Sequence, residues 1–519
     1  MQRDSLTRAL LNDEDDDSPL LPHSSRESLD SKRKNDEWRK WLGEELSQQL
    51  CIAGPMILVN LLQFSLTVVS LMFVGHLGEL ELSSSQIAVT TAQATGLNVM
   101  IGLGSGLETL CGQAYGAKEY RLTGIFLQRA IFLLTLIGIP ISFVWWRMGP
   151  ILVFIGQDPA IAEGAEEYIR LLIPTLFGYA LLQPLVKFLQ TQSAVKAMVV
   201  LSAITLAIHV PLCYLVIYTL GFGFRGAAIV TGISQWINAL FIGSYIMFSS
   251  TFSKTWTGLS TEAFQDIFLF FKVAFPSAVM ICLEFWCFDL LILISGLLPN
   301  PQLETSSLSV CLNSIAMLYM IPYGLSAAVS TRVSNKLGAG LPYAAKAAVK
   351  LTMSVALIEG VTVAFLLLSA RNIFPYLFSS EPDVVSYVSN MVPFLSLVVI
   401  LDSIQGTLSG VARGCGWQHV GAYCNLCAFY GIGIPVGLLL TFHFHLHGYG
   451  LWGGIIAGQT TQVSLLSFVT CTLNWQKLAD EAAQLVHGAK EHLHSALPPS
   501  ITKVDLLTEE RPGGFVGGG

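Results

Sequence analysis

The stretch LLQFSLTVVSLMFVG at residues 61–75 is followed 221 residues later by CLEFWCFDLLILISG at residues 282–296. Gln63 of the first stretch aligns with Glu284 of the second. Further matches occur in the same order at offsets of 221 to 224, and a nearly constant offset predicts a chain of two homologous halves. The matched pairs include Pro55 and Pro276, Gly102 and Gly324, Thr109 and Thr331, Gly116 and Gly338, and Gln235 and Gln459.

The composition is that of a membrane protein. Of 519 residues, 53% are hydrophobic and only 12% are charged, and the mean hydropathy is +0.60. A helix needs about 20 mainly apolar residues to cross the hydrocarbon core. Twelve such segments are predicted, at about 50–74, 86–107, 125–146, 168–189, 197–219, 226–249, 272–297, 307–329, 348–369, 385–411, 419–442 and 450–474. The predicted fold is an all-α polytopic membrane protein with twelve transmembrane helices in two pseudo-twofold related six-helix bundles.

The repeat also predicts the domain organisation. Two lobes, at 46–250 and 269–475, are joined by a cytoplasmic linker at 251–268. An acidic, Ser-rich tail at 1–45 is too poor in large apolar residues for a core and is predicted to be disordered. A second cytoplasmic tail covers 476–519. Six spans repeated in the same orientation place a pseudo-twofold axis along the membrane normal, with a cleft between the lobes.

The positions of Lys and Arg predict the orientation. They are concentrated in every second connection, and Lys187 and Arg413 are counted among them. Since cytoplasmic loops carry the excess of basic residues, both termini are predicted to be cytoplasmic.

Three motifs carry a resemblance to a known family. They are GLETLCGQAYGAKEY at 106–120, PYGLSAAVSTRVSNKLGAG at 322–340 and QGTLSGVARGCGWQ at 405–418. The chain, over about residues 40–480, closely resembles the multidrug and toxic compound extrusion (MATE) family, in particular its plant branch. The resemblance implies a two-lobe antiporter that exports or sequesters organic solutes and is driven by protons or sodium ions.

Acids inside the spans are the candidate functional groups, because an ionisable side chain in hydrocarbon is costly and usually faces a cavity or a partner. Glu284 lies near the predicted midplane, where the first half has Gln63, and Asp402 lies deep in the tenth span. The family pattern implies that both acids, together with Asn313, line a central cavity. Such a pair is expected to hold a proton or a cationic substrate, but not both.

Other polar residues in the spans leave alternatives open. Asp289 lies some 140° around the helix from Glu284 and so does not share its face. Its role is either that of a second proton partner or that of a structural helix contact. Glu359 is expected to be structural, and His209 is expected to be packed between helices. Structural roles for Glu284 and Asp402, satisfied by polar contacts across a helix pair, are the alternative to coupling.

The substrate pocket is expected to combine aromatic and amide side chains with the acids. Tyr319 and Trp286 are close to them in sequence and could bind an organic cation through their ring faces. Asn60 and Gln63 are the corresponding polar residues of the first lobe. Many bacterial relatives carry an aspartate in this first span, so their proton site is not carried over to this chain.

No enzyme, metal or cofactor signature is visible. The ten cysteines form no regular framework, and the His443, His445 and His447 cluster is expected to be solvated rather than to bind metal. No H-E-x-x-H motif or nucleophile grouping suggests a membrane enzyme. The predicted partners are a small organic substrate, protons and the lipid bilayer, without nucleic acid, and the predicted state is a monomer.

The predicted function is antiport of protons against cationic or amphipathic metabolites or xenobiotics, such as alkaloids or flavonoid conjugates, by alternating access. A sodium-coupled exporter, a lipid-linked precursor flippase of related shape and a channel remain alternatives. The segment DDSPLL at 16–21 has the form of an acidic dileucine signal, which favours the vacuolar membrane over the plasma membrane.

Overall fold

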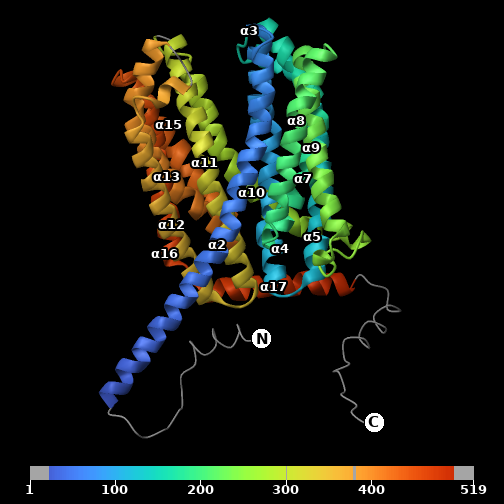
Figure 1. Ribbon diagram of the computed structural model, residues 1–519, viewed down its shortest axis with the longest axis vertical. Coiled ribbons are helices and arrows are strands. Elements are labelled where there is room, and N and C mark those ends of the chain that lie inside the picture. The colour runs from blue at the N-terminus through green and yellow to red at the C-terminus, as the bar shows by residue number, and fades with distance from the viewer. Residues whose placement is uncertain (1–22, 300, 378–380, 496–519) are drawn as a thin grey trace.

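The computed structural model describes residues 23–299, 301–377 and 381–495, which fold as a bundle of long helices (Figure 1). The first half contains α2 (His23–Gly75), α3 (Glu79–Ala92), α4 (Asn98–Gly116), α5 (Tyr120–Trp146), α6 (Met148–Phe154), α7 (Pro159–Thr191), α8 (Lys196–Tyr214) and α9 (Gly223–Phe248). The second half contains α10 (Ile267–Ser295), α11 (Pro301–Gly338), α12 (Pro342–Ser369), α13 (Pro382–Cys415), α14 (Gln418–Asn425), α15 (Ile434–Leu438), α16 (His447–Thr472) and α17 (Trp475–Ser495).

Short π-helical segments continue or join α-helices inside several spans. They are η1 (Gln93–Leu97), η2 (Leu215–Thr219), η6 (Leu426–Gly433) and η7 (Leu439–His443). Short 3₁₀ turns, η3 (Ser250–Phe252) and η4 (Thr261–Phe264), lie in the linker, and η5 (Phe374–Leu377) follows α12.

Eleven helical segments in the described part of the chain are long and apolar enough to cross a membrane, which confirms a polytopic all-α protein. They coincide in order with the first eleven predicted spans. The twelfth predicted span corresponds to α16, which has 26 residues but mixes Gly, Thr and Gln with its apolar residues. Its inner face, including Trp452 and Gln459, is buried. Such residues are tolerated because this face contacts α13 and η6 rather than lipid.

The two halves meet along α2, α4, α10 and α11. A Cβ atom at Gly102 would lie 2.4 Å from the Cα of Ala278, and one at Gly324 would lie 2.4 Å from a side-chain carbon of Ile57. These two contacts are equivalent under the sequence repeat, since Gly102 matches Gly324 and Ile57 matches Ala278. Each half therefore places an equivalent glycine against the equivalent helix of the other half, as a twofold interface requires.

The same symmetry holds at the end of the seam near α17. A Cβ atom at Gly116 would lie 2.1 Å from the carbonyl oxygen of Asn335, and one at Gly338 would lie 2.1 Å from that of Gln113. The two halves are thus in backbone contact at this end. Toward the opposite end their helices diverge (Figure 1).

Helix α17 crosses beneath both halves, perpendicular to the long helices (Figure 1). Its early residues Trp475 and Leu478 are buried against α11 and α12, whereas Val486 and Ala489 join the core of the first half. Lys490 Nζ also lies 2.8 Å from Glu119 Oε1, in the connection after α4. One amphipathic helix therefore contacts both lobes.

Two boundaries of the predicted tails are corrected. Helix α2 begins at His23, so residues 23–45 are helical rather than disordered. Lys, Arg, Glu and Leu in this segment are good helix formers, and the helix continues into an apolar span that stabilises it. The segment predicted as a tail from 476 begins with α17. The dileucine-like segment at 16–21 lies outside the described residues.

Candidate functional site

Glu284 lies on α10 and is bonded to the two neighbouring helices of the second half. Tyr319 on α11 donates its hydroxyl to Glu284 Oε1 over 3.3 Å. Gln405 on α13 donates its amide to Glu284 Oε2 over 2.9 Å. Both donors are neutral groups, so both carboxylate oxygens are satisfied without a directly bonded cation.

Asp402 lies on α13, one turn before Gln405, and is only 5% exposed. Gln459 on α16 donates its amide to Asp402 Oδ1 over 2.5 Å. The carboxyl groups of Asp402 and Glu284 are close enough to repel one another when both are ionised. The predicted acid pair is therefore brought together inside one lobe, each acid with its own glutamine.

Small residues allow the close packing that positions these donors. A Cβ atom at Gly410 would lie 2.4 Å from the carbonyl oxygen of Ser326, so α13 and α11 approach closely at this point. Ser326 in turn donates its hydroxyl to the carbonyl of Gly406 over 2.5 Å. This contact fixes the register that places Tyr319 and Gln405 on either side of Glu284.

The structure does not bring every predicted pocket residue to the acids. Trp286 is 41% exposed and donates its indole N–H to the carbonyl of Ala94 in the first half, over 2.8 Å. It follows Glu284 by two residues and so points about 200° away around α10. The Asn313 side chain is exposed, and Asp289 makes no side-chain hydrogen bond among the described residues.

The first half has no acid at the matching place. The amide nitrogens of Asn60 and Gln63 on α2 are buried without a hydrogen-bond partner among the described residues. Nearby, a small cavity of about 30 Å³ is lined by neutral groups that include Ser70, Gln93 and Gln235. His209 is fully buried beside it, with its two ring nitrogens 3.1 Å from Ser70 Oγ and 2.8 Å from Ser234 Oγ. His209 is therefore packed between helices.

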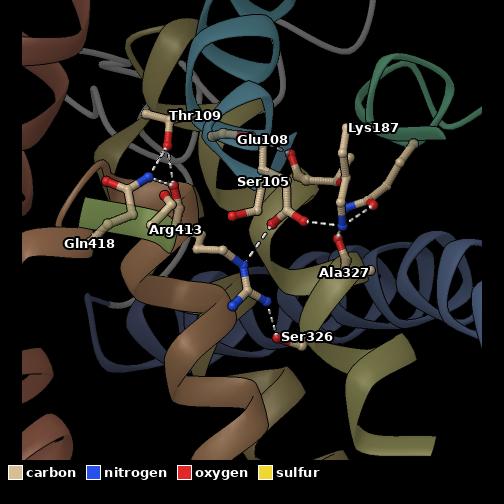
Figure 2. A network of polar contacts seen from close by, with 12 residues as sticks. Ser105, Glu108, Thr109, Lys187, Ser326, Ala327, Arg413 and Gln418 are labelled. Carbon is tan, nitrogen blue, oxygen red and sulfur yellow. Dashed lines mark hydrogen bonds and ion pairs between the residues drawn. The ribbon is translucent and has the colours of Figure 1, made fainter. Parts of the chain in front are cut away.

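A buried ionic network connects the two halves near the α17 end (Figure 2). Glu108 on α4 is bonded by two cations, Lys187 Nζ at 2.5 Å and Arg413 Nε at 3.0 Å. Lys187 belongs to the first half on α7, and Arg413 belongs to the second half on α13. All three are almost fully buried, with exposed fractions of 0%, 3% and 4%.

Hydrogen bonds around Arg413 extend this contact between the halves. Thr109 on α4 donates its hydroxyl to the carbonyl of Arg413 over 2.5 Å, and Gln418 donates its amide to Thr109 over 2.6 Å (Figure 2). The Arg413 guanidinium also donates to Ser326 Oγ over 2.7 Å. We call Glu108, Lys187 and Arg413 the inter-lobe triad.

The comparisons with known proteins agree with this architecture. The MatE family model matches residues 55–215 and again residues 276–439, at the same separation as the internal repeat. The chain belongs to the MATE family. The family resemblance inferred from the three motifs is thereby confirmed, and the chain is a membrane transporter of this family.

Similar plant MATE relatives cover most of the chain. Protein DETOXIFICATION 16 of Arabidopsis thaliana is 50% identical over 446 residues, 86% of this chain and 92% of the relative. Protein DETOXIFICATION 17 of the same plant is 49% identical over 86% of this chain and 94% of the relative. The crystal structure of the eukaryotic MATE transporter AtDTX14 superposes with a TM-score of 0.83 at 48% identity, over 86% of this chain and 99% of that one.

A more distant structure shares the fold alone. A multidrug resistance MATE family transporter in an outward-facing conformation matches with a TM-score of 0.74 at 16% identity, over 84% of this chain and 96% of that one. The two-lobe helical fold thus persists where little sequence identity remains.

Several polar residues of this MATE chain were missed by sequence reasoning. Lys187 and Arg413 were counted as basic residues of cytoplasmic connections, but both are buried in the inter-lobe triad. Glu108 lies within the motif that carries the family resemblance, yet its cations come from α7 and α13. Gln405 lies in a family motif and Gln459 is a repeat match of Gln235, but neither was assigned a role, because an amide in a span has no charge to mark it.

Proposed function

We propose that this MATE protein exchanges protons for cationic or amphipathic organic compounds and moves them out of the cytoplasm by alternating access. The observation that carries the proposal is the acid pair of the second lobe. Glu284 and Asp402 are held by the neutral donors Tyr319, Gln405 and Gln459. A carboxyl without a directly bonded cation can be neutralised either by a proton or by a cationic ligand.

This competition couples the two fluxes. On the acidic side of the membrane, protonation of the acids removes the attraction for an organic cation, and the cation leaves. On the cytoplasmic side, loss of the proton restores the negative charge, and the next cation binds. Tyr319 adds an aromatic face beside the carboxyl, which favours organic cations.

The first lobe supports the assignment of coupling to the second. Asn60 and Gln63 are amides and cannot release a proton in the physiological range, so this lobe offers no equivalent carboxylate. A sodium site there would have only neutral ligands. Proton coupling through Glu284 and Asp402 is therefore favoured over sodium coupling, and Asp289 on α10 is the candidate for a further proton partner.

Topology and location are part of the proposal. We place the α17 end in the cytoplasm, because Lys and Arg are concentrated in the connections at that end. Transport then runs toward the vacuole or the cell exterior, with alkaloids and flavonoid conjugates as candidate substrates. The protein acts as a monomer, since each chain contains both lobes.

The test is uptake of a fluorescent organic cation into liposomes with an acidic interior. Wild type should accumulate the cation only while the pH gradient persists. Glu284→Gln and Asp402→Asn should each reduce uptake to below about a tenth, because each removes one titrating group. Glu359→Gln is the matched control, since Glu359 is an acid of the same lobe but accepts its hydrogen bond from Ser403 and not from the donors of the pair.

Two outcomes would contradict the proposal. Wild-type uptake that ignores the pH gradient but follows an imposed sodium gradient would assign the coupling to sodium. Gradient-driven uptake that survives both acid substitutions would assign the coupling to another group, with Asp289→Asn as the next variant.

A further inference from the structure

The inter-lobe triad does not balance its own charge. It contains one carboxylate, Glu108, and two cations, Lys187 and Arg413, and all three are withdrawn from water. One positive charge is left over. An uncompensated charge in a buried site is costly unless another charge or a set of dipoles offsets it.

The triad also joins surfaces that must separate during transport. Glu108 and Lys187 belong to the first lobe, and Arg413 belongs to the second. If the lobes part at the α17 end, Arg413 leaves Glu108, and Lys187 and Arg413 both become accessible to water. When the α17 end is closed, the excess positive charge is therefore shielded from water. When this end is open, water hydrates the charge.

Helix α13 connects the triad to the acid pair. Gln405, Ser409 and Arg413 follow one another at intervals of four residues and so share one helix face. Gln405 bonds both Glu284 and Ser409, over 2.9 and 3.1 Å. Arg413 bonds Ser326, which in turn bonds the carbonyl of Gly406, next to Gln405.

Helix α11 provides a second connection. Tyr319 bonds Glu284, and its ring centroid lies 6.1 Å from that of Tyr323. Lys187 Nζ lies 5.7 Å from the centre of the Tyr323 ring. Both cations of the triad are thus linked, through one or two side chains, to the neighbourhood of Glu284.

Glu284 is a carboxylate outside the triad that attracts Arg413 when ionised, and its partner Gln405 lies two turns before Arg413 on α13. The other ionisable groups near Glu284 and Arg413 are Asp402, Tyr319, Tyr323 and Cys287. Asp402 is held by Gln459 on α16, and Glu359 beyond it is held by Ser403. Glu284 is therefore the group best placed to offset the leftover positive charge.

We propose that ionised Glu284 balances the inter-lobe triad and keeps the α17 end closed, and that protonation of Glu284 favours opening of that end. This inference rests on the proposed proton coupling and assigns gating roles to Glu108, Lys187 and Arg413. Its consequence for the cycle is direct. A carrier that has bound a proton from the vacuole or the cell exterior then opens its α17 end to the cytoplasm, where the proton is released.

The test measures opening at the seam in full-length protein in lipid nanodiscs, by hydrogen–deuterium exchange and mass spectrometry at one neutral pH. Glu284→Gln imitates the protonated acid. It should speed exchange in residues 104–119 about tenfold, because an opened seam admits water to this part of α4. The matched control Glu359→Gln should exchange at the wild-type rate.

A second substitution that restores the charge balance distinguishes an effect of charge from a general loss of stability. Lys187→Gln removes the excess positive charge, so the double variant Glu284→Gln with Lys187→Gln should return exchange to the wild-type rate. Wild-type exchange in Glu284→Gln, or fast exchange that persists in the double variant, would overturn the inference. Uptake that ignores the pH gradient would overturn the proposed function instead, so the two failures are distinguishable.

Discussion

At the scale of single residues, Gln63 and Glu284 show that the two halves of a duplicated fold can differ in function, since only one of the two side chains titrates. Both occupy matched positions on α2 and α10, but the amide nitrogen of Gln63 is buried without a partner in the described part of the chain, whereas Glu284 is bonded by Tyr319 and Gln405. An amide keeps the polarity of the position and cannot titrate. The second lobe therefore has a titratable group because glutamic acid replaces glutamine at this position, and donors from two other helices hold that group in place.

Removal of the glutamine that bonds Asp402 should change the proton affinity of the site. In Gln459→Leu, Asp402 loses an amide donor that stabilises its ionised form, so protons compete better with a cationic ligand. A hydrogen bond to a charged group contributes about 1.5 to 3 kcal/mol. One pH unit corresponds to about 1.4 kcal/mol, so the pH midpoint of cation binding should rise by about one to two units.

Equilibrium binding of a fluorescent cation to purified protein, titrated from pH 5 to pH 9, measures this midpoint. Gln476→Leu, on the exposed side of α17, should leave the midpoint unchanged. A midpoint that stays constant or falls in Gln459→Leu would show that the Gln459 amide does not stabilise ionised Asp402.

At the scale of the helices, the seam is formed by glycines that admit another backbone. Gly116 on α4 meets the backbone at Asn335, and its repeat partner Gly338 on α11 meets the backbone at Gln113. No side chain fits between these helices without displacing one of them. The α17 end is therefore closed by backbone contact as well as by the inter-lobe triad.

Gly116→Ala should loosen this end of the seam. The added methyl group would overlap a backbone carbonyl, which cannot rotate away as a side chain does, and overpacking of this kind costs about 1 to 3 kcal/mol. Exchange in residues 104–119 should accelerate, and the thermal midpoint of the purified protein should fall. Gly54→Ala on α2 is the matched control, because a Cβ there meets no atom within 4 Å. Equal behaviour of the two variants would contradict the close packing.

At the scale of the whole molecule, α17 links lobes that must move relative to one another. Its first turns are buried against the second lobe at Trp475 and Leu478, and its later turns are buried against the first lobe at Val486 and Ala489. Since one rigid helix cannot follow both lobes as they separate, one of its two contacts has to yield when the α17 end opens.

Val486→Asp should release the later half of α17 from the first lobe. A carboxylate at a site with 4% exposure would lose its hydration without gaining a cation, so the helix is expected to detach rather than bury it. Differential scanning fluorimetry should show a lower midpoint, and exchange in residues 483–491 should increase. Gln484→Asp introduces the same charge on the exposed face and should have little effect. A stable, protected Val486→Asp variant would show that this contact contributes little.

The sequence by itself determined the membrane location, the order of the helices, the duplication and the two acids of the second lobe. These features follow from apolar segment length, from a constant repeat offset and from the cost of an acid in hydrocarbon, all of which depend on local sequence. Only the tertiary structure decided which groups share a site. Glu108 meets Lys187 and Arg413 from separate helices, and Trp286 turns away from Glu284 although only one residue lies between them. Such contacts depend on helix rotation and on the packing of the two lobes, which the linear pattern does not encode.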